Sequence, residues 1–388
     1  MQTRETGRKR PPRPGRAVRP ASLRASPRVN GQAVRSNGVS SDGVATGPIA
    51  AASADLVYVS DAEPGIRRRR AGKGFRYLDL NGKTVGDRET LARIQALAIP
   101  PAWTDVWICP LPSGHIQATG RDQKGRKQYR YHAGWTACRD EAKFSSLTAF
   151  ASVLPKLRAR VEDDLRKRGT SRERVIASMV WLLDNTMMRI GNDIYMRQNK
   201  SFGLTTLRSR HVEIEGFRLR FSFTGKSGQE WKLKLADRRV ASVIRAMQEL
   251  PGQRLFQYVD EAGERRDIRS QDVNDYIRET IGSDFTSKHF RTWGATTAAA
   301  FLFADAPLPE TKRAQARLTN DVIDRVARRL RNTRAVCRRC YVHPAVVQSW
   351  LEGSLGEMAD IRRRLPKPLQ GLDIEESTVL RWLRDKDA

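Results

Sequence analysis

The sequence is poor in cysteine, and it has neither a long apolar run nor a phosphate-binding glycine loop. Four cysteines in 388 residues cannot form a disulfide-stabilised scaffold and suit a reducing compartment. The absence of a run of about 18 apolar residues excludes a membrane-spanning helix. Because no P-loop pattern occurs, nothing indicates ATP binding. We therefore expect a cytoplasmic protein that does not contact a membrane.

Basic residues, by contrast, are in large excess. The chain has 71 Lys and Arg residues against 43 Asp and Glu, a net charge of +28. Residues 1–54 contribute +8, so the remaining 334 residues still carry +20. With 39% hydrophobic residues the chain can also bury a core. This charge indicates a polyanionic partner, and nucleic acid is the one we expect.

Ligands for a metal ion are scarce. Cys337 and Cys340 have the spacing of half a zinc knuckle, but zinc needs four ligands, and Cys109 and Cys138 are distant single residues. The five histidines show no ligand spacing, and no tight acidic cluster would hold Mg²⁺. We expect no metal and no other cofactor, so that any DNA cleavage would depend on Lys and Arg to neutralise the phosphate.

The first part of the chain changes pattern near residue 55. Residues 1–54 are rich in Arg, Pro, Gly, Ser and Ala without a hydrophobic period, which predicts a disordered basic tail. Residues 55–133 predict a small antiparallel β domain with one helix near 88–98. The expected strands are 56–59, 75–80, 106–109 and 115–119.

Residues 136–352 predict a mainly helical domain with a small sheet, and 353–388 a C-terminal extension. Ser171 can cap a helix that ends at Gly191. Alternating apolar and polar residues from 217 to 235 around a turn at 224–228 are typical of a β-hairpin. Further helices are expected at 237–249, 270–281, 287–305, 309–331, 345–352 and 374–383. The predicted fold class is therefore α+β.

The segment GRDQKGRKQYRYH, residues 120–132, is a candidate for DNA contact. A basic turn leads into a strand with two tyrosines on one face. Arg and Lys neutralise phosphates, whereas Gln and Tyr can reach or stack on bases. A solvated hairpin on a basic protein would have the same pattern, so that alternative stays open. The candidate residues are Arg121, Lys124, Arg126, Lys127, Gln128, Tyr129 and Tyr131.

Several segments in order along residues 55–350 resemble the poxvirus-type and bacterial type IB DNA topoisomerases. Besides GRDQKGRKQYRY they are MRIG at 188–191, FGLTTL at 202–207 with RHVEI at 210–214, FTGK at 223–226, KHFRTWG at 288–294, and the run ending in Cys340-Tyr341. The resemblance implies a β domain and a tyrosine-recombinase/topoisomerase IB-like catalytic domain. It also implies a monomeric clamp on double-stranded DNA, hinged near Gly134, in a bacterial nucleoid.

The resemblance assigns the nucleophile and two arginines. Tyr341 matches the tyrosine that becomes joined to the 3′ end of the cut strand, and Arg189 and Arg291 match the arginines that bind the nonbridging phosphate oxygens. A phenol with a pKa near ~10 is a poor nucleophile at neutral pH. Two guanidinium groups beside it would favour the phenolate and stabilise the charge of the transition state.

Three further residues complete the implied site. Lys226 matches the hairpin lysine that protonates the departing 5′ oxygen, and Lys288 matches a lysine that supports this acid catalysis. Asn332 stands where viral members have histidine and bacterial members also have asparagine. Its amide can donate a hydrogen bond to phosphate but cannot carry a positive charge.

Two other functions stay open. A tyrosine recombinase shares this chemistry, but it usually has His three residues before the second Arg, where this chain has Lys288. An architectural DNA-binding protein would need only the basic charge. A tyrosine recombinase would require paired DNA sites, and an architectural protein would form no covalent adduct.

Each catalytic candidate also has an ordinary structural alternative. Arg189 lies near a predicted helix end, where any cation is favoured, and Lys226 could be a solvated turn residue. Arg291 could form a cation–π pair with Trp293. Tyr341 is one of eight tyrosines. The family resemblance, not the spacing, favours the catalytic roles.

Overall fold

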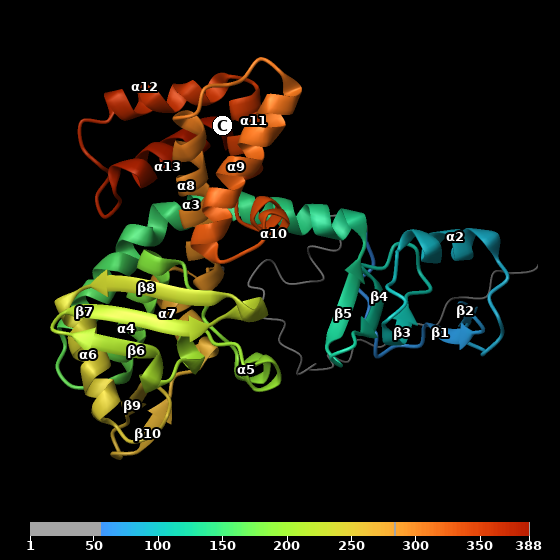
Figure 1. The fold of residues 1–388 in the computed structure, drawn as a ribbon, viewed down its shortest axis with the longest axis horizontal. Helices are drawn as coiled ribbons and strands as arrows, with labels where there is room; N and C mark the ends of the chain where they lie inside the picture. Colours follow the sequence, from blue (N-terminus) through green and yellow to red (C-terminus); the bar gives the residue numbers. More distant parts are fainter. Residues whose placement is uncertain (1–55, 283–284, 388) are drawn as a thin grey trace, which may run out of the picture. The chain divides into compact units, whose positions relative to one another are not determined.

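The computed structural model of the chain describes residues 56–282 and 285–387 (Figure 1). The predicted basic tail, residues 1–54, lies outside the described residues. Within the described ranges no helix has both the length and the apolar character to cross a bilayer. The described fold is α+β, as the sequence predicted, with one larger antiparallel sheet, two small sheets and many helices.

The N-terminal part is a five-stranded antiparallel sheet in the order β2-β1-β3-β4-β5. Helix α2 (Arg88–Ala96) begins after Asp87, whose side chain accepts a hydrogen bond from the Thr90 amide. The strands are β1 (Ile66–Ala71), β2 (Gly74–Leu78), β3 (Thr104–Ile108), β4 (Ile116–Arg121) and β5 (Lys127–Tyr131). The apolar core here is small and is formed by Ile66, Ile94, Val106, Ile108 and Ala118.

Two strand predictions in this sheet were wrong. Residues 56–59 form no strand and make only an isolated bridge between Val57 and Gly114. Strand β1 was missed, because its four consecutive arginines hide the alternation of apolar residues that marks a strand. The structure explains this arginine run. Arg68 is half-buried, and its guanidinium donates hydrogen bonds to the backbone oxygens of Ile99, Pro100 and Trp103, in the segment between α2 and β3.

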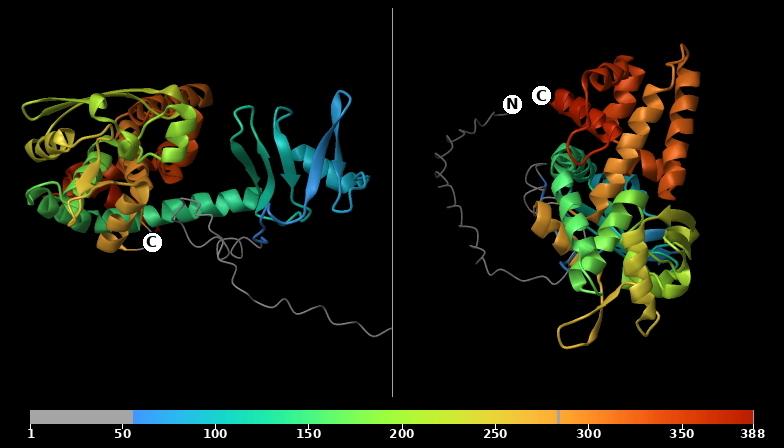
Figure 2. Two further views of the ribbon diagram at one scale, coloured as in Figure 1. Left: turned by 90° about the horizontal axis from the view of Figure 1, so that it is seen from below. Right: turned by 90° about the vertical axis from the view of Figure 1, so that its left-hand side faces the viewer.

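The rest of the chain is mainly helical. Its helices are α3 (Ala133–Arg166), α4 (Arg172–Thr186), α5 (Asp193–Asn199), α6 (Arg238–Glu249), α7 (Ser270–Ile281), α8 (Ser287–Ala304), α9 (Lys312–Leu330), α10 (Arg334–Cys340), α11 (Pro344–Leu351), α12 (Glu357–Arg364) and α13 (Ile374–Asp387). In the left view of Figure 2, α3 is the long green helix. Its first turn includes Gly134, the predicted hinge residue, so no loop separates β5 from this helix.

The predicted hairpin is confirmed. Strands β7 (Arg218–Thr224) and β8 (Glu230–Ala236) pair with Phe221 opposite Leu233 and Phe223 opposite Trp231. A third strand, β6 (Val212–Glu215), adds to the other edge of β7. A second small hairpin, β9 (Gln257–Val259) and β10 (Arg265–Asp267), was not predicted. Its strands are only three residues long, too short to show an alternating pattern.

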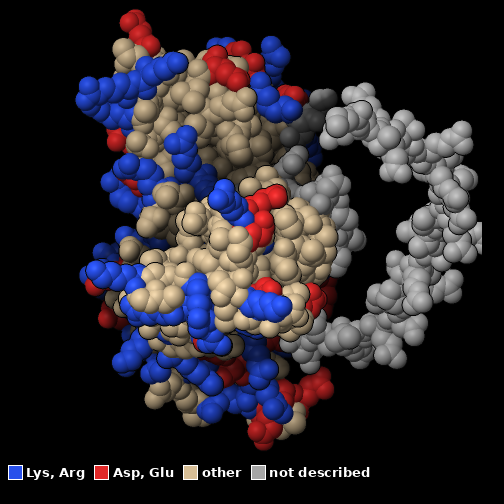
Figure 3. All heavy atoms as spheres, turned by 90° about the vertical axis from the view of Figure 1, so that its right-hand side faces the viewer, with Lys and Arg blue, Asp and Glu red and all other residues tan. Residues whose placement is uncertain are grey.

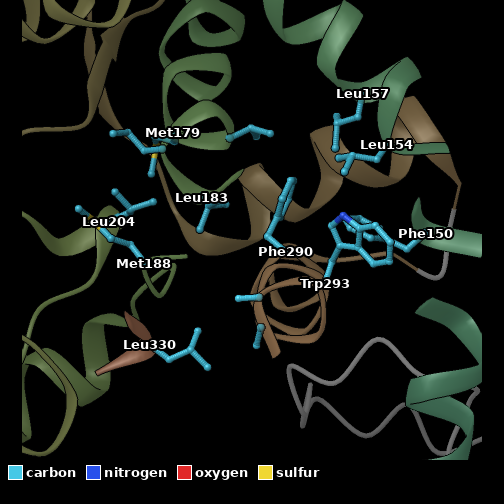
Figure 4. Packing of buried hydrophobic residues seen from close by; sticks show 14 of the residues in the cluster. Phe150, Leu154, Leu157, Met179, Leu183, Met188, Leu204, Phe290, Trp293 and Leu330 are labelled. Carbon is cyan, nitrogen blue, oxygen red and sulfur yellow. The ribbon is translucent and has the colours of Figure 1, made fainter. Parts of the chain in front are cut away.

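The helical core is organised around α8. This helix contacts α3, α4, α9, α11 and α13, and most of its side chains are buried. Figure 4 shows Phe290 and Trp293 of α8 beside Phe150, Leu154 and Leu157 of α3. Because α8 is held on so many sides, side chains that project from it have little freedom to move.

Helix α4 ends earlier than predicted. Its last residue is Thr186, and Met187 follows in the left-handed conformation with φ of 55°. The predicted stop, Gly191, lies five residues beyond the end of the helix, in a loop where its φ is 96°. The carbonyl oxygen of Met187 has no partner within the helix. It accepts a hydrogen bond from the Arg291 side chain instead.

Residues 353–388, predicted as an extension, contribute to the same core. Val379, Leu380, Trp382 and Leu383 of α13 are buried in the cluster that contains the α8 side chains. Helix α12 was not predicted and packs against α13. The last helix is therefore an integral part of the helical core.

A buried ionic network fastens α13. Glu376 accepts hydrogen bonds from Arg158 of α3, at 2.6 and 2.8 Å, and from the Trp293 indole at 2.9 Å. Arg158 also binds Asp184 of α4. Burial alone would raise the pKa of Glu376, but the hydrogen bonds and charge of Arg158 outweigh it and keep this pKa below its ordinary value. The network thus joins three helices to α8.

Removing the acceptor in this network should destabilise the protein. We expect Glu376→Ala to lower the free energy of unfolding by about 3 kcal/mol, because part of the Arg158 charge and the Trp293 N–H lose their partner. Glu375→Ala, at an exposed neighbouring position in the same helix turn, should cost less than about 1 kcal/mol. Denaturant unfolding would measure both. Equal effects of the two substitutions would contradict the role of the network.

Candidate active site and DNA-binding face

Arg189 is placed by a contact between two glycines. After α4 the chain is extended, and the carbonyl oxygens of Arg189 and Ile190 accept hydrogen bonds from the amides of Leu204 and Thr205, at 2.9 and 2.8 Å. Gly203 lies so close to Gly191 that a Cβ on Gly203 would be 2.6 Å from the Gly191 Cα. The two backbones can meet only because neither residue has a side chain. This contact fixes the loop segment from which Arg189 projects.

Arg291 projects from α8 and is almost fully buried, with 3% of its surface exposed. Its guanidinium donates to the carbonyl oxygen of Leu330 at 2.9 Å and to that of Met187. Its Cζ lies 4.9 Å from the centre of the Tyr341 ring. The ends of α4 and α9 therefore hold the guanidinium against the phenol.

Asn332 and Tyr341 follow the ends of two consecutive helices. Arg331 ends α9 in the left-handed conformation, and the Asn332 amide then donates to the Ala327 oxygen at 2.9 Å. The Asn332 side-chain oxygen accepts a hydrogen bond from Arg189. Tyr341 ends α10, where its amide donates to the Cys337 oxygen at 3.0 Å. The structure thus brings Arg189, Arg291, Asn332 and Tyr341 together from four segments.

Three buried donors in this group have no hydrogen-bond partner among the described residues. They are Nη1 of Arg189, Nε of Arg291 and Nδ2 of Asn332. Unpartnered buried donors are costly and therefore rare in folded proteins. Donors of this type, two of them on guanidinium groups, are suited to an anion with several oxygens, such as phosphate.

The charges around Tyr341 alter its acidity. Burial by itself would raise the pKa of Tyr341, but Arg291, Arg189 and Lys143 together hold it below the ordinary value of tyrosine. Burial, with the nearby charge of Arg189, lowers the pKa of Arg291 to about 10. Desolvation likewise lowers the pKa of Arg189. The site therefore favours negative charge on the phenol and would gain from an added anion.

Lys288 lies one helical turn before Arg291 on α8. Loss of surrounding water lowers the pKa of its ammonium group, and the nearby Tyr341 opposes this effect. A lowered pKa suits a group that gives up a proton near neutral pH. Lys288 is therefore near enough to Tyr341 for their charges to interact.

Lys226 is not part of this group in the structure. It lies in the exposed turn between β7 and β8, with its Nζ 5.8 Å from the centre of the Tyr195 ring on α5. Tyr195 is in turn close enough to Arg189 to affect its pKa. Sequence reasoning did not select Tyr195, because a single tyrosine in a short polar helix has no distinguishing pattern. The structure shows no hydrogen bond or ion pair between Lys226 and the described residues of that group.

The β4–β5 hairpin presents a basic, aromatic face. Tyr129 and Tyr131 stack with ring centres 5.7 Å apart and are 41% and 39% exposed. Lys127 lies on the same face, 5.5 Å from the Tyr129 ring, and its cross-strand partner is Arg121. Exposed aromatic rings beside cations are suited to nucleic acid. Figure 3 shows basic side chains gathered along one side of the face that it displays, with acidic side chains fewer.

The other candidates in this hairpin are placed differently. Arg126 forms an ion pair with Asp122 at 2.6 Å, and Gln128 donates to the same carboxylate at 3.0 Å. Gln128 alternates with the two tyrosines along β5 and so lies on the opposite face. Lys124 is exposed in the turn.

Two basic residues of this sheet were missed in the sequence. Arg67 and Arg69 of β1 are exposed and share a face, because they are two residues apart in a strand. Arg67 is paired with Trp107, which is paired with Thr119, which is paired with Tyr129. Directly paired residues share a face of the sheet, so Arg67 and Arg69 extend the face of Tyr129. The run of four arginines was the signal that could have identified them.

Comparison with known proteins agrees with this geometry. Residues 128–364 match the family model of the eukaryotic DNA topoisomerase I catalytic core, and residues 74–122 match that of the bacterial DNA topoisomerase IB N-terminal domain. DNA topoisomerase 1B of Acanthamoeba polyphaga mimivirus is 36% identical over 289 residues, covering 72% of this chain and 85% of the viral protein. The chain belongs to the type IB DNA topoisomerase family.

More distant relatives belong to the same group. DNA topoisomerase I of Monkeypox virus and DNA topoisomerase 1B of Vaccinia virus (strain Copenhagen) are each 23% identical over 288 residues, covering 71% of this chain and 87% of each viral protein. Membership confirms the resemblance drawn from the motifs and identifies the chain as a DNA-binding isomerase. The recombinase and architectural hypotheses lose their support.

In the described ranges no three His, Cys, Asp or Glu side chains are grouped to hold a metal ion.

The glycine contact that positions Arg189 can be tested in this topoisomerase. Gly203→Ala would place a Cβ 2.7 Å from the Arg189 oxygen, so the arginine segment must shift. We expect about 100-fold slower DNA cleavage and a loss of about 1–3 kcal/mol in the free energy of unfolding. The control is Gly356→Ala, where a Cβ would meet no atom within 4 Å. Wild-type cleavage by Gly203→Ala would show that Arg189 does not depend on this contact.

Proposed function

We propose that this enzyme relaxes supercoiled DNA by cutting one strand, holding the cut end covalently on Tyr341, and resealing it. The observation that supports this proposal best is the group formed by the phenol, the buried Arg291 and the half-buried Arg189, each arginine with one unpartnered buried donor atom. A phosphodiester placed beside Tyr341 would fill those donors with its nonbridging oxygens. The broken end would rotate and be resealed without ATP, because the phosphotyrosyl bond conserves the energy of the broken bond.

The cleavage step exchanges one oxygen on phosphorus for another. The Tyr341 oxygen forms a bond to phosphorus, its proton passes to water, and the bond from phosphorus to the 5′ oxygen breaks. Arg189 and Arg291 stabilise the added negative charge of the transition state, and each such donor contributes about 3–4 kcal/mol in comparable sites. Asn332 orients Arg189 through its side-chain oxygen and can donate its free N–H to the phosphate. Resealing is the same step in reverse.

The departing 5′ oxygen needs a proton. We assign this proton to Lys226, with Lys288 supporting the transfer from beside the phenol. This assignment requires the exposed β7–β8 turn to bring Lys226 from Tyr195 to the leaving oxygen once DNA is bound. An exposed turn can shift in this way without disturbing the helical core.

The hairpin face would hold the duplex. Arg121, Lys127, Tyr129 and Tyr131, with Arg67, supply charge and aromatic surface for phosphates and sugars, while Lys124, Arg126 and Gln128 lie at the turn or on the other face. We propose a monomer that closes on double-stranded DNA as a clamp, hinged near Gly134, in the bacterial nucleoid. Because many phosphates would be neutralised, binding should weaken steeply as salt rises.

Removal of the Tyr341 hydroxyl should separate binding from chemistry. We expect Tyr341→Phe to bind DNA like wild type but to form no covalent adduct and to relax no plasmid. Denaturation after mixing with DNA traps the adduct for gel analysis. Tyr258→Phe, in β9, should behave like wild type. An adduct that persists in Tyr341→Phe would place the nucleophile elsewhere.

The general-acid role of Lys226 has a chemical test. Replacing the bridging 5′ oxygen by sulfur gives a leaving group that needs no proton. Lys226→Ala should cleave ordinary DNA about 100-fold or more slowly and recover on the sulfur-substituted strand. Lys234→Ala removes the same charge from an exposed position of the same hairpin and should need no such rescue. If Lys226→Ala stays slow on the sulfur substrate, the assignment is wrong.

A further inference from the structure

We propose that Lys143 of α3 is a positioning residue for the nucleophile, holding the backbone from which Tyr341 projects. The motifs did not select this lysine, and it lies almost 200 residues before Tyr341 in the sequence. The inference rests on the proposed role of Tyr341. It adds a further cation to Arg189, Arg291 and Lys288, from a helix that supplies none of the other site residues.

The contact is made to the peptide bond next to the nucleophile. The Lys143 ammonium donates a hydrogen bond to the carbonyl oxygen of Cys340, the last residue of α10. Its Nζ also lies 5.3 Å from the centre of the Tyr341 ring. The last carbonyl groups of a helix lack partners within the helix and attract cations. Lys143 therefore meets the negative end of α10 where Tyr341 begins.

Neighbours of Lys143 anchor this part of α3. Phe144 is buried, and its ring lies 5.2 Å from the His343 ring, edge to face. Leu147, one turn further along α3, is fully buried in the main core. Lys143 thus projects from a turn of helix that is packed against the segment after Tyr341. This packing restricts where Lys143 can lie relative to Cys340.

A second side chain holds the other side of the nucleophile. Thr296 of α8 is fully buried. Its hydroxyl donates a hydrogen bond to the backbone carbonyl oxygen of Tyr341 at 3.2 Å and accepts one from the backbone amide of His343 at 3.1 Å. The two carbonyl groups on either side of the Tyr341 Cα are therefore bound by side chains from two different helices. Lys143 carries a charge and Thr296 does not, and this difference allows the effects of the two side chains to be separated.

The charge of Lys143 acts on the phenol as well. Together with Arg291 and Arg189 it holds the pKa of Tyr341 below its ordinary value. Burial raises the pKa of Cys337 to about 12, so this thiol stays neutral. The titratable and charged groups around the phenol are Lys143 from α3, Arg189 after α4, Lys288 and Arg291 from α8, and Cys337, Cys340 and His343 on its own segment.

The experiment compares single-turnover cleavage rates across pH for three variants. Lys143→Met should slow cleavage about 10-fold or more and move the midpoint of the rate profile upward by roughly half a pH unit or more, because loss of a cation raises the pKa of Tyr341. Lys143→Arg should restore the midpoint. Thr296→Val should slow cleavage without moving the midpoint, because it removes positioning but no charge.

Lys156→Met provides the matched control on the same helix. Lys156 is exposed, so its loss should change neither the rate nor the midpoint. A wild-type rate and midpoint in Lys143→Met would overturn the proposal. So would a midpoint shift in Lys156→Met equal to that in Lys143→Met, since the effect would then be one of net charge.

A direct titration distinguishes this proposal from that of the previous section. In protein labelled with ¹³C at tyrosine Cζ, the Tyr341 signal is assigned by its loss in Tyr341→Phe. Its titration midpoint should rise in Lys143→Met and not in Lys156→Met. An unchanged midpoint would overturn the role of Lys143 even if wild type forms the adduct. If Lys143→Met raises the midpoint but wild type forms no covalent adduct with DNA, the proposed function is contradicted and the role of Lys143 is not.

Discussion

Two guanidinium groups lie beside a phenol, one buried and one half-buried, and no described carboxylate forms an ion pair with either of them. Arg291 is held by backbone oxygens of Met187 and Leu330, and Arg189 by the side-chain oxygen of Asn332. These neutral acceptors satisfy part of each cation without cancelling its charge. The positive potential of the site is therefore preserved, and the surrounding fold must stabilise a group of like charges that would otherwise repel one another.

The fold holds these like charges together with helix ends and loops rather than with one rigid element. Helix ends supply the carbonyl groups that bind Arg291, a left-handed turn at Arg331 presents Asn332, and a contact between two glycines sets Arg189. Arg291 projects from the interior of α8 and Lys288 from its first turn, and that helix is packed on several sides. The exposed Lys226 turn lacks this support, which would suit the proton donor that we propose, a group needed only when substrate is present.

The sequence predicted those features that depend on local pattern. The β7–β8 hairpin, most helices of the second region and the α+β class follow from periodicity, and the family follows from six short segments in order. Strand β1 was missed because its consecutive arginines hide the alternation of apolar residues, whereas α4 ends early where the Met187 oxygen binds the distant Arg291. The proximity of Lys143 to Tyr341 could not be predicted, since no local pattern relates residues so far apart. Catalytic roles came from family resemblance alone.

The buried network of Glu376 has a consequence for the order in which the core closes. Helix α13 binds Trp293, two residues after Arg291, and Arg158 of α3, although 83 and 218 residues separate Glu376 from these two partners. Contacts between residues so far apart in sequence are slow to form, because a long segment of chain must first be closed into a loop. One wall of the core around α8 would therefore stay open until α13 docks, and Arg291 would reach its final position only after that late step.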